Sequence, residues 1–439
     1  MKSFLLIPLF LLAACAQPDC SRVETFVRED PLRSASNLHR YEVLDSSVTE
    51  APRGYVPFYV SHISRHGSRS AVDDSFSAVL DSLGKFDSCS QLTAEAQEMF
   101  ATLLAIKSLN DSVEPGALTS LGASEHRNIA RRMCGNYPEV FSDSARRFVL
   151  CYSTSVPRVV KSMDNFTESL SSSFPGLVVC KAFGKESDRN HDEIGGFDLS
   201  KAQKKLHSGF DIAPLRDSLM AAWDLSRLIE KTFVGGKVPA SLEGDEGQFF
   251  HNIYKAGAIR QCFEDSPTPW IEPYFNGDEL YLFWQRWNIK HLFKWGWVEE
   301  NHGIYAYSKS PVLKSIIRDA DTAVAGSDTC ATFRFTHDSV LQPLICIMGL
   351  DWNDWHGSLR EVCDHCCMAH TTHMASNVQL IFFRNRKGNV IVKILLNEEE
   401  ITIPALKPDF KGVFYEWTRL REYFNDSIDE LENNINNQS

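Results

Sequence analysis

Five consecutive residues, Arg65-His66-Gly67-Ser68-Arg69, place two arginines and a histidine around a glycine. An arginine guanidinium pairs bidentately with phosphate oxygens and keeps its charge at physiological pH. A histidine can act as a nucleophile near neutral pH when one ring nitrogen stays unprotonated. The pattern therefore indicates a site that holds a phosphate group against His66. A surface loop of ordinary solvated charges is the alternative interpretation of the pentapeptide alone.

Two later stretches repeat the arrangement of a strand-like run followed by polar residues. Residues 147–153 have strand composition, and Arg158 falls in the first turn of the helix predicted to follow. Residues 330–335 also have strand composition, and they lead into His337 and Asp338 before another apolar helix. Taken singly, Arg158 is as compatible with an ion pair as with a ligand. Three such turns in one chain favour a shared site.

The elements around the first motif predict where this site lies. Residues 55–63 are rich in β-branched and aromatic residues and follow a Pro-Arg-Gly breaker, which indicates a buried strand. Apolar residues at helical spacing between 76 and 83 predict a helix after the motif. In open α/β sheets, ligands bind beyond the carboxyl ends of the strands, where helix N-termini offer free N–H groups. We therefore expect the motif on a strand-to-helix turn.

Together the three turns contain the groups that phosphoryl transfer requires. The reaction needs an in-line nucleophile, positive charge around the equatorial oxygens and an acid for the leaving group. His66 would attack phosphorus and become a phosphohistidine, Asp338 would protonate the departing alkoxide, and water would then release phosphate. The candidates for binding the phosphate oxygens are Arg65, Arg69, Arg158 and His337. The scheme uses no metal ion or cofactor, because the arginines take the part of a divalent cation.

These motifs resemble those of the histidine acid phosphatases, a group within branch 2 of the histidine phosphatase superfamily. The shared features are an R-H-G-x-R motif, a lone arginine further along the chain and a distal His-Asp, which occur here in that order. The resemblance extends over most of the chain from Tyr41 to Phe424 and is weak between Phe183 and Ser327. It implies a phosphatase that works through a phosphohistidine.

The flanking residues look closer to bacterial multiple inositol polyphosphate phosphatases. This similarity lies in residues 51–62, 337–350 and 395–398. Members of that clade hydrolyse phytate and related inositol phosphates, so the resemblance implies an inositol polyphosphate phosphatase. One feature departs from the clade, which usually carries His-Ala-Glu where this chain has His337-Asp338-Ser339.

Two alternatives remain open for the function. The His-Asp arrangement is that of broader acid phosphatases and other phytases, so the chain could instead hydrolyse sugar phosphates or other monoesters. A third interpretation is a lipoprotein that binds phosphorylated ligands without turnover. The presence of both His66 and Asp338 counts against that third interpretation.

We predict a layered α/β/α core with a mixed central sheet, built from residues 20–182 and 328–424. Residues 183–327 contain helix-like apolar patterns, and the resemblance implies a mostly α-helical insertion that forms a cleft wall. Basic residues in this stretch are candidates for meeting further phosphate groups, namely Lys185, Arg189, Lys201, Lys204 and Lys205. A hairpin between 378 and 395 would complete the sheet. The polar tail 425–439 is expected to fray.

The N-terminal residues predict export. Lys2 precedes an apolar run from Phe4 to Ala14, which suits a signal peptide but is too short to span a membrane. Residues 12–15, Leu-Ala-Ala-Cys, resemble a bacterial lipobox, so residues 1–15 are interpreted as a lipoprotein signal peptide ending at a lipidated Cys15. The protein would then be anchored in the bacterial cell envelope, periplasmic or surface-exposed. A secreted protein without the lipid is the alternative.

The composition restricts the partners and the metal chemistry. A formal net charge of -12 over 439 residues argues against a nucleic acid partner, and no protein partner is indicated. Twelve cysteines less Cys15 leave eleven, so at least one thiol has no partner within the chain. The cysteines and histidines at 363–373 fit no standard zinc spacing, so buried thiols or a local disulfide are favoured there over a metal.

Overall fold

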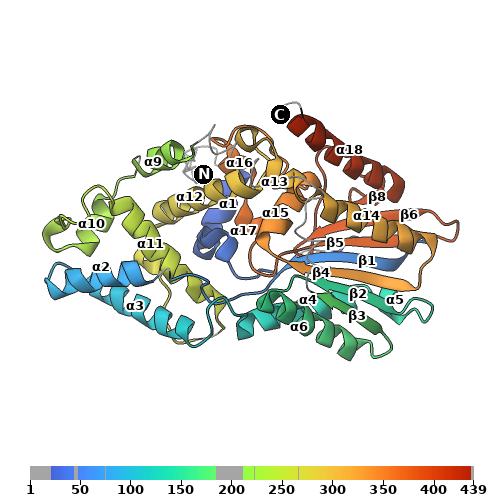
Figure 1. Cartoon of the computed structure of the whole chain (residues 1–439), viewed down its shortest axis with the longest axis horizontal. Coiled ribbons are helices and arrows are strands. Elements are labelled where there is room, and N and C mark those ends of the chain that lie inside the picture. The colour runs from blue at the N-terminus through green and yellow to red at the C-terminus, as the bar shows by residue number, and fades with distance from the viewer. Residues whose placement is uncertain are drawn as a thin grey trace, which may run out of the picture.

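A computed structural model describes residues 21–43, 48–74, 76–183, 211–221, 223–264 and 266–436. These residues form two halves, an α/β half around one sheet and a second half made of helices (Figure 1). Cys15 and the basic residues between 185 and 205 lie outside the described residues. Within the residues described, no helix is both long and apolar enough to cross a membrane.

The sheet joins strands from both ends of the chain. In spatial order it contains β3 (Val178–Phe183), β2 (Phe148–Ser153), β4 (Thr329–Thr336), β1 (Val56–Arg65), β5 (Asn377–Arg384), β6 (Val390–Leu396) and β7 (Glu399–Glu400), and β8 (Phe414–Glu416) pairs with β6. The first four strands are parallel, whereas β5 pairs with β1 and β6 pairs with β5 in antiparallel fashion. This arrangement confirms the predicted mixed sheet and its C-terminal hairpin.

Helices cover one face of the sheet through a core rich in phenylalanine. α4 (Ser120–Asn136) and α6 (Pro157–Ser173) pack here, with Phe166 of α6 close to Phe333 and Phe335 of β4. Pro157 occupies the first turn of α6, where its missing N–H costs nothing.

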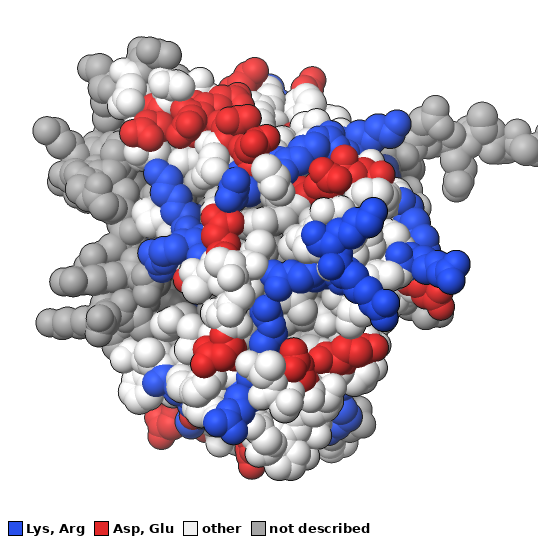
Figure 2. All heavy atoms as spheres, turned by 90° about the vertical axis from the view of Figure 1, so that its right-hand side faces the viewer, with Lys and Arg blue, Asp and Glu red and all other residues white. Residues whose placement is uncertain are grey.

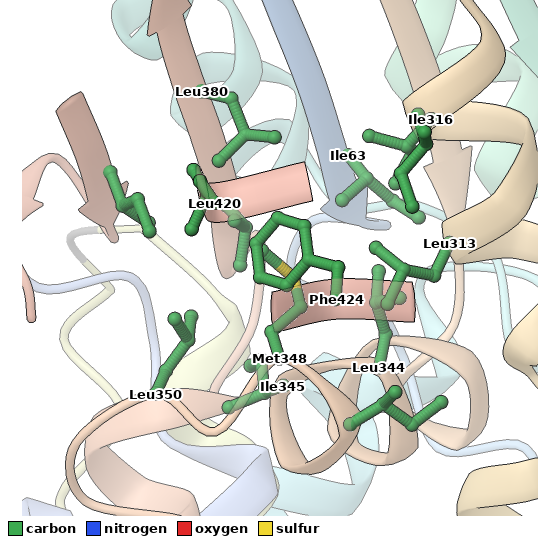
Figure 3. Close-up of a cluster of buried hydrophobic side chains, with 14 of the residues drawn as sticks. Ile63, Leu313, Ile316, Leu344, Ile345, Met348, Leu350, Leu380, Leu420 and Phe424 are labelled. Atoms are coloured by element: carbon green, nitrogen blue, oxygen red, sulfur yellow. The ribbon is translucent and has the colours of Figure 1, made fainter. Parts of the chain in front are cut away.

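The opposite face of the sheet packs against three helices that come later in the chain. These are α14 (Ser310–Ala325), α15 (Asp338–Ile347) and α18 (Trp417–Asn436). Figure 3 shows Ile63 of β1 and Leu380 of β5 meeting Leu313, Leu344 and Phe424 of these helices. The two covered faces make the core a three-layer α/β/α structure, as predicted.

The helical half has a core of its own. Its principal helices are α2 (Ser77–Ser88), α3 (Ala94–Asp111), α10 (Ser226–Thr232), α11 (Glu246–Ala258) and α12 (Gly277–Trp295). Leu83 of α2 and Leu103 of α3 belong to the same buried cluster as Phe250 of α11 and Phe283 of α12. The remaining helical elements of the described residues, which are distributed over both halves, are α1 (Arg22–Glu29), η1 (Pro31–Leu38), α5 (Pro138–Ser142), α9 (Ala213–Ala221), η2 (Val234–Gly236), η3 (Ile259–Cys262), η4 (Glu272–Tyr274), η5 (Glu299–Asn301), α13 (Ile304–Tyr307), α16 (Val362–His365) and α17 (Met368–Thr371).

This division differs from the predicted single insertion at 183–327. α2 and α3 precede that range but pack in the helical half, whereas α14 lies inside it but packs on the sheet. The spacing of apolar residues reveals which face of a helix is buried, but it does not reveal which element covers that face.

The predicted fraying of residues 425–439 is wrong for the part that the structure describes. α18 continues to Asn436, and Ile428 and Leu431 are fully buried against the α/β half. Leu420, Phe424, Ile428 and Leu431 share one helical face, which the many polar residues between them conceal.

The end of the α/β half that lies farthest from the helical half carries charges of both signs. Figure 2 shows lysine and arginine side chains interspersed there with aspartate and glutamate. Mixed charge of this kind is typical of a solvated surface, so this face offers no uniformly basic platform.

Candidate active site

The three predicted motifs follow neighbouring strands of the sheet. Arg65 ends β1 and pairs in register with Thr336, which ends β4, and Ser153 at the end of β2 pairs with Phe335 of β4. The rings of His66 and His337 consequently lie 5.6 Å apart between centroids. Because parallel strands present their carboxyl ends at one edge, segments far apart in the chain meet here.

Two of these turns lead directly into a helix, and the first does not. α6 starts at Pro157 and α15 starts at Asp338, whereas α2 starts only at Ser77 and belongs to the helical half. The expected helix N-terminus behind His66 is therefore absent from this position among the described residues.

His66 is buried and held in one tautomer. Its Nδ1 lies 2.9 Å from the carbonyl oxygen of Gly67, which can only accept, so Nδ1 carries the hydrogen and Nε2 is left with a lone pair. Burial keeps the pKa of His66 well below its ordinary value, and the charges of Arg65 and Arg158 lower it further. His66 is thus a neutral imidazole that presents a nucleophilic nitrogen.

Gly67 is required because two backbones approach each other closely. A Cβ at Gly67 would lie 2.4 Å from the carbonyl oxygen of Gly122 at the start of α4. A Cβ at Gly122 would similarly lie 2.2 Å from the carbonyl oxygen of Ser68. The Gly67 N–H donates to Ser162 Oγ of α6 at 3.1 Å. These contacts seat the motif on α4 and α6.

Arg65 is completely buried and already has protein partners. Its Nη1 donates to the carbonyl oxygens of Asn37 and Thr372, and its Nη2 lies 2.9 Å from Asp338 Oδ2. Burial lowers the pKa of Arg65, and the neighbouring Arg69 adds to this effect. Arg65 therefore contributes charge to the site and also positions Asp338.

Three buried donors near His66 have no acceptor in the described structure. They are the Nε atoms of Arg65, Arg69 and Arg158. Burial lowers the pKa of Arg158 to about 10, and repulsion from Arg69 and Arg65 contributes to this shift. Buried donors without partners are rare in folded proteins. Mutually repelling guanidinium groups with unused donors are the arrangement that an anion would stabilise.

His337 and Asp338 complete the arrangement. His337 Nε2 lies 3.3 Å from Thr154 Oγ1, and burial followed by the charge of Arg158 lowers its pKa to about 4. Burial favours the neutral form of Asp338, but Arg65 and His291 outweigh this and lower its pKa to about 2. The cationic groups around Asp338 therefore favour its ionised form.

Sequence reasoning missed several groups that hold these side chains. Asn37 Nδ2 donates to Asp338 Oδ2 at 2.8 Å. Glu125 accepts from the backbone N–H of Ser68 and from its hydroxyl, both at 2.7 Å, and from the N–H of Tyr41 at 3.1 Å. One signal was available, since Glu125 falls on the buried face of α4, three residues after Gly122. Nothing in the local sequence marks Asn37.

A cleft of about 280 Å³ lies between Asn37 and Arg69 on one side and helices α11 and α12 on the other. Asn37 and Arg69 line it on the catalytic side, and Lys255 of α11 with Arg286 and Lys290 of α12 line it on the other. Helices α11 and α12 therefore place basic residues on the side of this cleft that lies opposite Asn37 and Arg69.

The cysteine and histidine cluster at 363–373 has separate contacts for its members. Asn288 donates to Cys363 Sγ and to the Cys366 carbonyl, and His370 stacks on Trp352 with ring centroids 4.3 Å apart. The described residues contain no group of three histidine, cysteine or acidic side chains placed to hold a metal. The ten cysteines of the described ranges are free thiols.

Comparison with known proteins agrees with this geometry. Residues 59–204 match the model of the histidine phosphatase superfamily, branch 2. No curated protein matches the chain.

Solved structures share the fold over most of the chain at low identity. The multiple inositol polyphosphate phosphatase of Bifidobacterium longum in complex with phosphate has a TM-score of 0.73 at 19% identity, over 89% of this chain and 97% of that one. Its complex with inositol hexasulfate has a TM-score of 0.72, also at 19% identity and with the same coverage of both chains. The phytase from D. castellii has a TM-score of 0.67 at 15% identity, over 97% of this chain and 90% of that one.

Proposed function

Residues 59–204 match the branch 2 histidine phosphatase model, and from that match we propose that this chain is a histidine phosphatase that hydrolyses phosphate monoesters of inositol polyphosphates through a phosphohistidine at His66. The observation that carries the proposal is the set of three arginine Nε donors that lie buried, without acceptors, around a neutral His66. A phosphate group supplies the acceptors that these donors lack. In this proposal the arginines supply the positive charge that stabilises the transferring phosphoryl group. The proposed mechanism therefore uses no metal ion.

The mechanism has two steps. His66 Nε2 attacks phosphorus, the bond from phosphorus to the ester oxygen breaks, and Asp338 gives a proton to the departing alkoxide. Water then attacks the phosphohistidine, the P–N bond breaks with its electrons returning to the ring, and Asp338 takes a proton from the water. The negative charge of the bound phosphate offsets Arg65, which allows Asp338 to hold the proton it needs for the first step.

The opposite wall of the cleft supports a substrate with several phosphate groups. Lys255, Arg286 and Lys290 face the catalytic side across one cavity, in a protein whose net charge is -12. A single phosphate on His66 does not need a second basic wall, whereas phosphates distributed around an inositol ring do. Two of the solved neighbours are described as an inositol polyphosphate phosphatase and a phytase, which is consistent with this substrate class.

A phosphatase of broad specificity is the alternative. It is favoured by His337-Asp338, because this order places the donor directly after the histidine as in acid phosphatases that act on many monoesters.

Substrate comparison tests the proposal. Phytate and simple sugar phosphates are offered at matched concentration, and released phosphate and the inositol products are measured. We expect a higher kcat/KM for phytate. Preference for the sugar phosphates would end the inositol polyphosphate assignment, and no turnover of any monoester by folded protein would leave only the phospholigand-binding lipoprotein.

The N-terminal residues carry a separate proposal about location. The lipobox-like residues 12–15 support lipidation of Cys15 and a tether in the bacterial cell envelope. Mass spectrometry of the mature N-terminal peptide, expressed in a bacterial host, should find a diacylglyceryl group on Cys15, and Cys15→Ser should release the protein from the membrane fraction. An unmodified N-terminus beyond Cys15 would indicate a secreted protein.

A further inference from the structure

The proton donor Asp338 is held by a side chain from a segment near the N-terminus. Asn37 lies 301 residues earlier in the chain, in η1, and its Nδ2 donates to Asp338 Oδ2 at 2.8 Å. The Asn37 carbonyl oxygen also accepts from Arg65 Nη1, while Arg65 Nη2 reaches Asp338 Oδ2. Asn37, Arg65 and Asp338 thus form a closed ring of contacts, of which Asn37 lines the cleft.

The hydrogen bonds of Asp338 leave one place for the catalytic proton. Oδ2 accepts from both Arg65 and Asn37, and Oδ1 accepts from the N–H of Ser339 at 2.9 Å. Each carboxylate oxygen has about two lone-pair sites. Oδ2 is therefore saturated, and the open site is on Oδ1. We propose that Asn37 is a positioning residue that fixes the plane of the Asp338 carboxyl group and directs its proton to Oδ1; this inference rests on the proposed phosphatase function.

Asparagine suits this position because it is a neutral donor. A lysine or arginine here would add a positive charge and stabilise the ionised form of Asp338 still further, whereas an aspartate would compete with it as an acceptor. The side chain is mostly buried, with 6% exposed, so its hydrogen bond is protected from water.

The segment that carries Asn37 is itself held firmly. Arg33 forms hydrogen bonds with both oxygens of Glu42, at 3.0 and 2.7 Å, and Gln261 of η3 donates to the Leu32 carbonyl at 3.0 Å. The N–H of Met374, which precedes β5, donates to the His39 carbonyl at 2.9 Å. Asn37 is thus placed by contacts from both halves, and such support is what holds a catalytic group in one geometry.

The experiment compares esters with good and poor leaving groups. In Asn37→Ala we expect kcat for an alkyl ester, glycerol phosphate, to fall about 10-fold, and kcat for an aryl ester, para-nitrophenyl phosphate, to change less than about 3-fold. KM should change little for either ester, because Asn37 acts on the donor rather than on the phosphate. Asn37→Ser, whose hydroxyl is too short to reach Asp338, should give the same pattern and serves if the alanine variant does not fold.

A double-mutant comparison identifies the route of the effect. If Asn37 acts through Asp338, adding Asn37→Ala to the Asp338→Asn variant should lower kcat for the alkyl ester by less than about a further 2-fold. Asn301→Ala is the matched control, because Asn301 is a buried asparagine that binds the Phe293 and Gly296 carbonyls. It should lower thermal stability without changing the ratio of alkyl to aryl rates.

Two outcomes overturn the inference and leave the phosphatase function intact. One is an equal fall in kcat for alkyl and aryl esters in Asn37→Ala and Asn37→Ser. The other is a double variant in which the effects of Asn37→Ala and Asp338→Asn on kcat are fully additive. The phosphatase function fails by a different result, the absence of turnover in the unmodified protein.

Discussion

The buried residues of the candidate site and the basic residues on the helical wall of the cleft are held in opposite ways. On the sheet side, Arg65 and His66 are 0% and 2% exposed, and each has a fixed hydrogen-bond partner. On the helical side, the Lys255 side chain is 38% exposed and its ion-pair distance to Asp73 is 3.7 Å, while Lys290 is exposed. Bond making requires reacting atoms in one geometry, whereas attraction of further phosphate groups requires only charge of the right sign. The walls therefore should respond differently to substitution.

Replacement of the nucleophile should have the largest effect. His66→Ala removes the nitrogen that we propose attacks phosphorus, and we expect kcat to fall by about a thousandfold or more for every ester. Rapid quench with labelled substrate should trap an acid-labile phosphoenzyme in the unmodified protein and none in the variant. A phosphoenzyme that persists in His66→Ala would place the nucleophile elsewhere.

Removal of the donor should have the next largest effect. Asp338→Asn keeps the hydrogen bond from Arg65 but cannot give up a proton, so we expect alkyl esters to slow about a hundredfold and aryl esters about tenfold or less. Steady-state kinetics on both ester classes measure this. Equal slowing of the two classes would mean that Asp338 is not the acid.

Acid should lower the free energy of unfolding through two buried histidines near the candidate site. Burial lowers the pKa of His62 and of His126 to about 3. Between about pH 7.5 and pH 5 the unfolded chain binds protons at these positions and the folded protein does not, so stability falls by about 2 kcal/mol for each histidine, or about 30-fold in the folding equilibrium. Urea unfolding at several pH values measures how steeply the free energy of unfolding depends on pH.

The same experiment has an internal control. His62→Phe keeps an aromatic ring against Phe166, whose centroid lies 5.1 Å away, and removes the titrating group. Its free energy of unfolding should depend less steeply on pH in this range. An unchanged slope would show that His62 does not remain neutral in the folded protein.

Loss of charge from the helical wall should have the smallest effect and should depend on the substrate. In the double variant Lys255→Met and Lys290→Met we expect KM for phytate to rise about 10-fold, while kinetics on para-nitrophenyl phosphate stay within about 2-fold. Lys314→Met, on the exposed surface of α14, is the matched control. It should change the kinetics on neither phytate nor para-nitrophenyl phosphate. A similar loss on both substrates would give the helical wall a part in the chemistry.

Local patterns in the sequence predicted the elements that carry the reacting groups. The strand at 55–63, the helix that begins at Pro157 and the hairpin at 378–395 all form where they were expected. Each depends on residues close together in the chain, because strand alternation and helical spacing are local properties. The division of helices between the two halves could not be predicted in this way, since it depends on which buried faces meet.

The sequence by itself determined which residues are available for chemistry and in what order they occur. The types and order of Arg65, His66, Arg158 and Asp338 already indicated phosphoryl transfer. Only the tertiary structure decided that His66 is neutral with its Nε2 free, that Asp338 is ionised before substrate binds, and that Asn37 holds it. A pKa and a hydrogen-bond partner depend on burial and on groups brought from distant parts of the chain, and no local pattern of residues records either.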